Sequence, residues 1–276
     1  MTQSENIITV TVVQPKYRHK EKPDESIRKF ITAALDKAPE NGIILFPEYS
    51  NAGGLSDIDS ERRAMAYAGE LLAYAAAAAK RKNCIVGINV LEEKLGVAKN
   101  RTYLYNKDGT IAFVYDKQHI PPSEIKLGVH MGDGSGTCHC TCTLGGIKFA
   151  FLTCYDIYFN EQIEKIAAFK PDIILFPGYQ RGERQDILAA QAKLLAFRCN
   201  AYVLKSSYSI GRGKRGGCSM IVSPDGRILK NSGNKVGIFS QEIDCLWKYR
   251  RAAGFNEKPV LNDEFINNGL CPEAFM

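Results

Sequence analysis

Three short apolar runs in this chain each end at a residue that can act as a base, a cation or a nucleophile. Residues 42–47, 110–116 and 146–153 are followed by Glu48, Lys117 and Cys154, respectively. A buried apolar run bounded by turn signals is typical of a core strand, and open α/β sheets build their sites beyond the carboxyl ends of such strands. We therefore expect a carboxylate, an ammonium and a thiol to meet in one pocket. Together they supply the parts that acyl transfer requires.

Each of these residues also has an ordinary structural explanation. Most single cysteines are small buried core residues, a lysine at a strand end is usually solvated, and a glutamate after a proline can cap a helix or loop. Cys154, however, lies where an apolar strand turns sharply into an amphipathic helix. A thiol at such a turn gains reactivity from the helix N-terminus and from a nearby ammonium. It is the combination with Glu48 and Lys117 that favours chemistry.

The elements expected around these residues form two similar halves. The first contains a strand, a helix, a strand, a long helix, a strand and a hairpin: Ile7–Val13, Asp24–Ala38, Ile43–Phe46, Asp59–Lys82, Cys84–Val90, and Arg101–Tyr105 with Ile111–Tyr115. The second contains two strands, a helix, a strand, a helix, a strand and a hairpin: Cys138–Thr143, Ile147–Leu152, Asn160–Phe169, Ile173–Phe176, Gln185–Asn200, Ala201–Ser206, and Ser219–Ser223 with Ile228–Leu229. The Asp-Gly pairs of both hairpins are typical turn residues.

One segment is nearly repeated between the halves. Residues 41–49 read Asn-Gly-Ile-Ile-Leu-Phe-Pro-Glu-Tyr, and residues 171–179 read Pro-Asp-Ile-Ile-Leu-Phe-Pro-Gly-Tyr, so only the first copy carries the carboxylate. Two β-rich halves with helices between their strands, and no linker between them, predict an α/β fold with two sheets face to face and helices outside. We expect one domain over residues 1–276, a four-layer α-β-β-α sandwich with two internally similar halves.

Composition places the chain among ordinary globular proteins. Of its 276 residues 45% are hydrophobic and 24% charged, and no stretch approaches the ~20 apolar residues that span a bilayer. The apolar start lacks a basic leader and a cleavage site, so we expect a cytoplasmic protein. Nine cysteines without regular spacing favour reduced thiols. The net charge of +6 is spread along the chain and gives no indication of a nucleic-acid partner.

The chain resembles the nitrilase superfamily, the carbon-nitrogen hydrolases, over nearly its whole length. The resemblance is carried, in the family's order, by Gln14-Pro15, Phe46-Pro-Glu48, Asp116-Lys-Gln-His-Ile120, Cys154-Tyr-Asp156, Ser219 with its Pro-Asp-Gly hairpin, and Tyr249-Arg-Arg251. It implies a four-layer α-β-β-α sandwich whose subunits pair through helices into homodimers or larger assemblies. It implies no cofactor. It also implies that Glu48 is the general base, Lys117 stabilises the tetrahedral intermediate, Cys154 is the nucleophile, and the backbone N–H of Tyr155 is a second oxyanion donor.

The expected activity is cleavage of a non-peptide C–N bond in a small amide or carbamoyl compound through a cysteine thioester, releasing ammonia or an amine and a carboxylic acid. Two alternatives remain open. The same three groups can convert a nitrile to an acid, and a non-catalytic binding protein could retain the fold. Fast alkylation of Cys154 at neutral pH would distinguish an enzyme from a binding protein.

Two further positions are weighed through the resemblance. Many family members carry a second glutamate that helps to position substrate, and Glu124 is the nearest match here, although Leu127–Gly132 replaces the usual aromatic and glycine pattern. A site role and an ordinary loop acid both stay open for Glu124. Asp156 is expected to cap or brace the turn at Cys154. Tyr158 stands where relatives often have a basic residue, so that position gives no substrate inference.

A metal site is not expected. On a strand, Cys138, Cys140 and Cys142 would lie on one face about 6.5–7 Å apart, whereas sulfurs sharing a tetrahedral zinc must lie under about 4 Å from one another. Small core thiols are the preferred interpretation. His119 and His130 flank the lysine loop and do not make a convincing Cys–His dyad.

Three loops are expected to line the substrate pocket, namely residues 49–57, 179–184 and 209–217. We expect Tyr155, Tyr179 and Arg181 to contact substrate. Arg181 or Arg212 could pair with a substrate carboxylate, because guanidinium groups bind carboxylates in bidentate fashion. A solvated glycine-rich turn is the alternative for 209–217. The tail 253–276 shows no clear regular pattern and is a candidate for packing on a partner subunit.

Overall fold

The computed structural model describes residues 6–17, 23–53, 62, 64–94, 96–131, 139–211 and 213–269. Two six-stranded sheets dominate the structure. The first has the order β12-β1-β2-β3-β4-β5, with bounds Gly237–Asp244, Ile7–Gln14, Ile43–Leu45, Ile85–Lys94, Val97–Tyr105 and Ile111–Asp116. The second has the order β11-β10-β9-β8-β7-β6, with bounds Ile228–Asn231, Met220–Val222, Tyr202–Ser206, Ile173–Pro177, Ile147–Phe151 and Thr141–Leu144.

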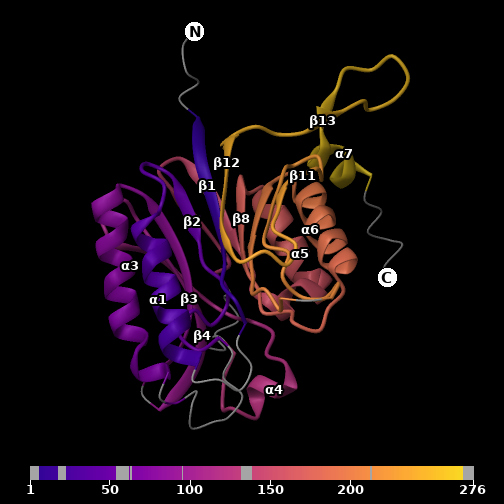
Figure 1. Cartoon of the computed structure of the whole chain (residues 1–276). Coiled ribbons are helices and arrows are strands. Elements are labelled where there is room, and N and C mark those ends of the chain that lie inside the picture. The colour runs from indigo at the N-terminus through magenta and orange to yellow at the C-terminus, as the bar shows by residue number, and fades with distance from the viewer. Residues whose placement is uncertain are drawn as a thin grey trace.

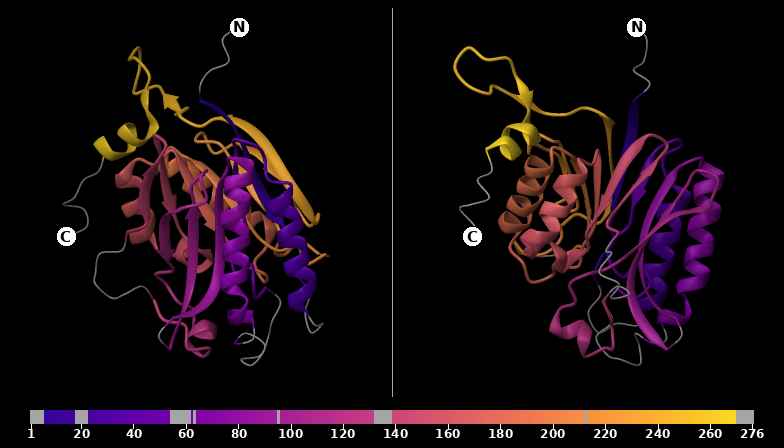
Figure 2. Two further views of the ribbon diagram at one scale, coloured as in Figure 1. Left: turned by 90° about the vertical axis from the view of Figure 1, so that its left-hand side faces the viewer. Right: turned by 180° about the vertical axis from the view of Figure 1, so that it is seen from behind.

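The sheets face each other and the helices lie outside them (Figures 1 and 2). Helices α1 (Pro23–Asp36) and α3 (Ala68–Lys82) cover the first sheet, and α5 (Asn160–Phe169) and α6 (Gln185–Cys199) cover the second. The predicted four-layer α/β fold is therefore confirmed. The alanine run of α3 lies against the first sheet, with Ala75 and Ala79 fully buried.

Small residues allow the two sheets to approach closely. A Cβ added to Gly87 in β3 would lie 2.9 Å from Leu45 Cδ1 and 3.4 Å from Leu175 Cδ1 of the second sheet. The apolar runs β2, β8 and β9 are buried along their whole length, as expected of strands covered on both faces.

The sheets are joined at the carboxyl ends of their parallel strands. Strands β1, β2 and β3 are parallel to one another, and so are β7, β8 and β9. The hydroxyl of Tyr208, which follows β9, donates to the carbonyl of Tyr49, which follows β2, at 2.9 Å. Ser206 Oγ donates to the Val13 carbonyl at 2.5 Å. Residues that follow β2, β7, β8 and β9 therefore gather at one end of the molecule.

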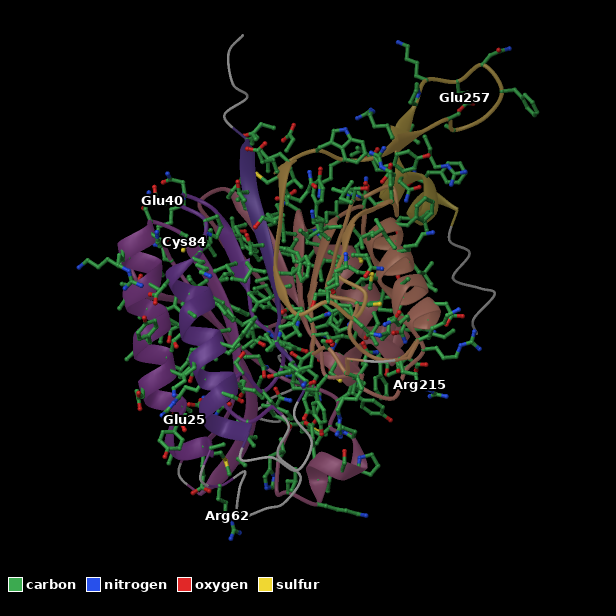
Figure 3. The ribbon with its side chains drawn as sticks, in the orientation of Figure 1. Glu25, Glu40, Arg62, Cys84, Arg215 and Glu257 are labelled. Atoms are coloured by element: carbon green, nitrogen blue, oxygen red, sulfur yellow. The ribbon has the colours of Figure 1, made fainter. Side chains whose placement is uncertain are left out.

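The structure departs from the expected elements mainly near the carboxyl end. Strand β12 was not expected, and the supposedly irregular tail contains β14 (Val260–Leu261) and α7 (Asn262–Asn268). Strand β14 pairs with β13 (Arg250–Arg251), and the loop between them projects from the body, with Glu257 near its tip (Figure 3). Helix α3 starts at Ala68, and the expected start at Asp59 lies outside the described residues. The described helices include none with the length and apolar character needed to cross a bilayer.

Candidate active site

Two carboxylates and one ammonium meet where the first sheet ends. Glu48 follows β2, Lys117 follows β5, and Glu124 lies on the short helix α4 (Pro122–Ile125). Lys117 Nζ donates to Glu48 Oε1 at 2.7 Å and to Glu124 Oε1 at 2.5 Å. All three side chains are buried. Glu124 therefore belongs to this cluster rather than to a solvated loop.

Asn100 of β4 holds the two carboxylates together. Its side-chain amide donates to Glu48 Oε1 at 2.8 Å and to Glu124 Oε2 at 3.4 Å, and its carbonyl accepts from the backbone N–H of Lys117 at 2.9 Å. Asn89 of β3 donates to the Asn100 side chain at 2.8 Å. Sequence reasoning missed Asn100. The signal was an asparagine at a position of β4 that alternates with partly exposed ones and therefore faces the protein interior.

Cys154 occupies a strained turn directly beyond β7. It begins the 3-10 helix η1 (Cys154–Tyr158) with φ 48°, in the left-handed region that non-glycine residues enter only at a cost. A capping box fixes the turn: the side chain of Thr153 accepts from the backbone N–H of Asp156, and Asp156 Oδ2 accepts from the backbone N–H of Thr153 at 2.8 Å. The turn thus holds Cys154 at the strand end.

Asp156 also ties this turn to the lysine loop. Its carboxylate accepts from the Tyr115 hydroxyl at 2.7 Å and from the backbone N–H of His119 at 2.9 Å. The expectation that Asp156 braces the turn is confirmed. His119 Nδ1 lies 2.9 Å from Asp156 Oδ1, and its ring stacks on Phe159 with centroids 3.7 Å apart. The partner of His119 is therefore Asp156.

Burial and charge act together on the ionisable groups. Loss of water contact raises the pKa of the Cys154 thiol well above its ordinary value, the negative charge of Glu48 raises it further, and Lys117 opposes both. Burial lowers the pKa of Lys117, but Glu48, Cys154 and Glu124 outweigh it and leave that pKa raised. Burial and the charge of Glu48 raise the pKa of Glu124. At neutral pH the site therefore holds a charged ammonium and a protonated thiol.

Cys154 differs from most described cysteines in its accessibility. Cys84, Cys140, Cys199, Cys218 and Cys245 are buried, whereas Cys142 and Cys154 are partly exposed. Burial raises the pKa of Cys142 to about 12, and no charged neighbour contributes to that shift. Of the described thiols, Cys154 alone combines access with an adjacent carboxylate and ammonium.

The described cysteines of the 138–142 cluster are core thiols, which is the interpretation preferred from the sequence. Cys140 belongs to the hydrophobic core and Cys142 packs against it, while Cys138 lies outside the described residues. His139 is exposed.

The predicted substrate contacts surround the same end of the molecule. Tyr179, which follows β8, packs edge-on against Tyr49 and Tyr208 with ring centroids 5.8 Å and 5.2 Å apart. The guanidinium of Arg181 lies 4.8 Å from the Tyr179 ring centroid and donates to the Tyr17 hydroxyl. Tyr155 follows the thiol and packs on Phe159 with centroids 5.2 Å apart. Arg212, the other candidate carboxylate ligand, lies outside the described residues.

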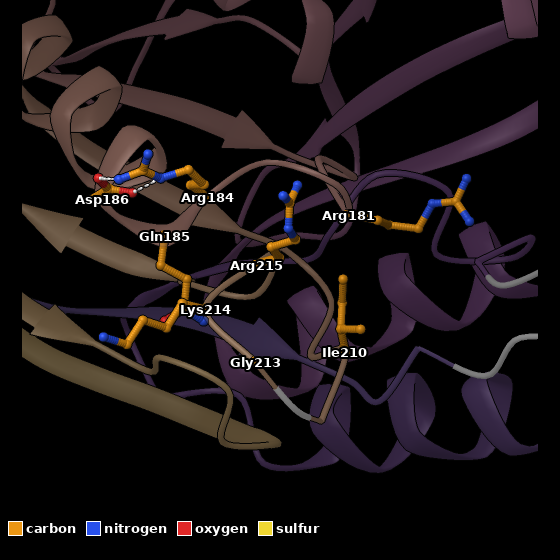
Figure 4. A pocket seen from close by; sticks show the side chains of 8 residues that line it. All are labelled: Arg181, Arg184, Gln185, Asp186, Ile210, Gly213, Lys214 and Arg215. Atoms are coloured by element: carbon orange, nitrogen blue, oxygen red, sulfur yellow. Dashed lines mark hydrogen bonds and ion pairs between the residues drawn. The ribbon is translucent and has the colours of Figure 1, made fainter.

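The loops after β8 and β9 enclose an open basic pocket of about 810 Å³ (Figure 4). Its lining includes Arg181, Arg184, Lys214 and Arg215, with Asp186 as the acidic member. Arg184 is paired with Asp186 through Nη2 and Oδ2, 2.5 Å apart, whereas the other cationic side chains point in different directions. The pocket therefore has a positive electrostatic potential, but its cationic side chains do not point to one common position where an anion would bind.

A second lysine near the site was not anticipated. Lys205 of β9 is fully buried, and its charge interacts with those of Cys154 and Glu48. A lysine that follows the apolar run Tyr202–Leu204 was a signal that the sequence offered.

Comparison with known families and proteins places the chain in a family. The model of the carbon-nitrogen hydrolase family matches residues 9–247. The chain is 26% identical over 234 residues to 2-oxoglutaramate amidase of Bacillus subtilis, covering 81% of this chain and 86% of that protein.

Solved structures share the fold at low sequence identity. An amidase of the nitrilase superfamily from Nesterenkonia AN1 superposes with a TM-score of 0.72 at 18% identity, over 88% of this chain and 94% of that one. A carbon-nitrogen hydrolase from Helicobacter pylori G27 superposes with a TM-score of 0.71 at 20% identity, over 87% and 90% of the two chains. With the family model matching most of its length, the chain belongs to the carbon-nitrogen hydrolase family.

Proposed function

We propose that this protein is an amidase in which Cys154 attacks the carbonyl carbon of a small amide. The observation that carries the proposal is the buried Glu48–Lys117–Glu124 cluster beside Cys154, whose thiol pKa responds to the charges of all three side chains. An ammonium held by two carboxylates keeps its charge, and a thiol with a raised pKa needs a base at the moment of attack.

Glu48 is the proposed base. Its Oε1 is bonded to Lys117 and Asn100, whereas its Oε2 is buried and receives no N–H or O–H donor from the described residues. A side-chain hydrogen bond between Glu48 and the Cys154 thiol contributes to the raised pKa of that thiol. A carboxylate oxygen without N–H or O–H donors is the natural acceptor for the thiol proton. Glu48 then returns that proton to the leaving amine, and later removes one from the water that attacks the thioester.

The developing negative charge falls to Lys117 and to the backbone N–H of Tyr155. As the thiolate sulfur bonds to the carbonyl carbon, the carbonyl oxygen becomes an oxyanion and pairs with these donors. Collapse breaks the C–N bond and leaves a thioester on Cys154. Water releases the carboxylic acid and restores the thiol. Glu124 and Asn100 position Lys117 and Glu48 during both steps.

Amide hydrolysis is favoured over nitrile hydrolysis because amidases stand among both the curated and the structural relatives. One Nesterenkonia structure is a complex with acrylamide and another with butyramide. Carbamoyl compounds remain within the proposed substrate range. We further propose that the protein acts in the cytoplasm as a homodimer or larger homo-oligomer.

Ammonia release across primary amides, carbamoyl amines and nitriles tests this proposal. We expect amides to give the highest kcat/KM and Cys154→Ala to abolish ammonia release. Cys142 is the other partly exposed cysteine among the described residues, and Cys142→Ala should leave the release unchanged. Nitriles turned over faster than every amide would assign the alternative activity. A Cys154 that iodoacetamide modifies no faster than Cys142, together with no turnover, would favour a binding protein.

A further inference from the structure

Lys205 is a fully buried lysine that the proposed chemistry does not use. It is 0% exposed, and its Nζ makes no hydrogen bond to any described residue. The ammonium lies 5.3 Å from the centroid of the Phe176 ring, a weak cation–π contact. Burying an ammonium without a counter-ion costs several kcal/mol. The charge of Glu48 offsets this cost only in part, because burial still lowers the pKa of Lys205, and no described residue accepts a hydrogen bond from Nζ. The position therefore points to a further anionic group that is not part of the protein.

The ammonium lies at the carboxyl end of the second sheet. Lys205 is paired in register with Phe176 of β8, and a Cβ added to Gly178 would lie 3.4 Å from Nζ. Gly178 begins the segment that leads to Tyr179, one of the predicted substrate contacts. A side chain at position 178 would therefore pack directly against Nζ.

Glu48 carries a second buried atom, Oε2, that receives no N–H or O–H donor from the described residues, and its charge is opposite to that of Lys205. The charge of Lys205 interacts with Cys154, Cys218 and Glu48. The two groups do not bond each other. Buried polar atoms left without partners are rare and call for a bound polar group. Glu48 Oε2 is accounted for by the proton of the thiol, whereas Lys205 requires a negative group.

We propose that Lys205 determines substrate specificity by pairing with a carboxylate on the amide substrate, so that the enzyme acts on anionic rather than neutral amides. This inference rests on the proposed amidase function. A carboxylate supplies a full negative charge and hydrogen-bond acceptors, and a charge-assisted bond would offset the cost of burying the ammonium. Lys117 cannot take this role, because its ammonium is already bonded to Glu48 and Glu124.

The basic pocket described above has the charge that such a substrate requires. The basic pocket formed by the loops after β8 and β9 lies at the same end of the molecule as Cys154, and its cationic side chains outnumber the acidic one. Because these side chains diverge, they attract an anion without binding it tightly (Figure 4). Burial lowers the pKa of Lys205 to about 8, which still leaves the side chain mostly charged at pH 7.

The test compares amides that differ only in the carboxylate. Succinamate and butyramide have the same length, as do glutaramate and pentanamide, one methylene longer. For the wild type we expect higher kcat/KM with both anionic members. Lys205→Met should lower kcat/KM for the anionic amides about 100-fold, because it removes one member of a buried charge pair, and should change kcat/KM for the neutral amides less than about threefold. Lys205→Arg, which retains the charge, should restore part of the preference.

Lys230→Met is the matched control, because it removes one charge from an exposed position on β11. It should leave both substrate classes unchanged. Thermal unfolding of each variant shows that the fold is retained. Equal loss for anionic and neutral amides in Lys205→Met, matched by slower alkylation of Cys154, would show that Lys205 acts on the thiol instead and would overturn the carboxylate assignment.

A binding experiment separates this inference from the proposed activity. Calorimetry with Cys154→Ala protein should show succinamate binding at least about 10-fold tighter than butyramide, and the Cys154→Ala/Lys205→Met protein should lose that difference. A charge preference in binding without any turnover in the wild type would contradict the amidase proposal alone. Neutral amides bound as tightly as anionic ones would contradict the role of Lys205 alone.

Discussion

At the scale of single residues, the main feature of the site is that one ammonium group is shared by two carboxylates. Lys117 serves both Glu48 and Glu124, and Asn100 bridges the same two carboxylates. Each acid then has a distinct task, because Glu48 keeps one oxygen without N–H or O–H donors from the described residues, whereas Glu124 directs one oxygen to Lys117 and the other to Asn100.

Glu124→Gln tests whether Glu124 positions Lys117 or controls the reactivity of Cys154. The substitution keeps the shape but removes the charge that holds Lys117 and raises the pKa of Cys154. We expect kcat to fall about 100-fold, as for loss of a group that supports an oxyanion donor, while the rate of Cys154 alkylation stays equal or increases. Steady-state kinetics and mass-mapped alkylation measure both. Glu93→Gln, at an exposed position on β3, is the control. An unaltered kcat would return Glu124 to a structural role.

Lys205→Met is expected to make the fold more stable at neutral pH. Burial lowers the Lys205 pKa from 10.5 to about 8, so between these values the unfolded chain binds more protons than the folded one, and wild-type stability rises with pH. Below pH 8 the full penalty of about 3 kcal/mol applies. Urea unfolding should therefore show a gain for Lys205→Met at pH 7 that shrinks as the pH approaches 10.5. A destabilised variant at pH 7 would mean that a partner already compensates the ammonium.

At the scale of elements, the turn after β7 holds Cys154 in a backbone conformation with positive φ. Its strain should be measurable, because Cys154 has φ 48°. Cys154→Gly is expected to be about 1 kcal/mol more stable than Cys154→Ala, since glycine adopts this region without steric cost. Both variants should be inactive. Equal unfolding midpoints would show that the backbone relaxes when the thiol is removed.

The elements that position the site were predictable where burial is continuous. Strands β2, β7 and β8 are recognisable in the sequence as apolar runs. The end of β2 locates Glu48, and the end of β7 locates Cys154. Strand β12 escaped prediction because most of its residues are partly or fully exposed and its apolar positions show no clear alternation. Asn100 was missed because the carboxylates that it bridges lie far away along the chain, and Lys205 because its complete burial is set by the packing of the fold. A polar residue within a strand was a signal in both cases, but it does not by itself assign a role. The turn strain at Cys154 is likewise visible only in the backbone.

At the scale of the whole molecule, the site forms because the carboxyl ends of the parallel strands of both sheets lie at the same end of the molecule. The hydrogen bond from Tyr208 to the Tyr49 carbonyl crosses between them beside Glu48. Tyr208→Phe should reduce stability by about 1 kcal/mol, the usual net value of one hydrogen bond, and lower kcat/KM by loosening the segment after β2. Tyr74→Phe, which removes an exposed hydroxyl contact to Asp36, is the control in urea unfolding. A larger loss in the control would contradict this account of the inter-sheet contact.

The claim on which everything else depends is that Cys154 carries a covalent acyl intermediate. Acid quenching during turnover of an amide, followed by peptide mass mapping, measures it directly. The account predicts that the acyl mass appears on the peptide containing Cys154, accumulates when water attack is slow, and is absent in Cys154→Ala. Turnover with no acyl group on Cys154, or with the group on another residue, would contradict it.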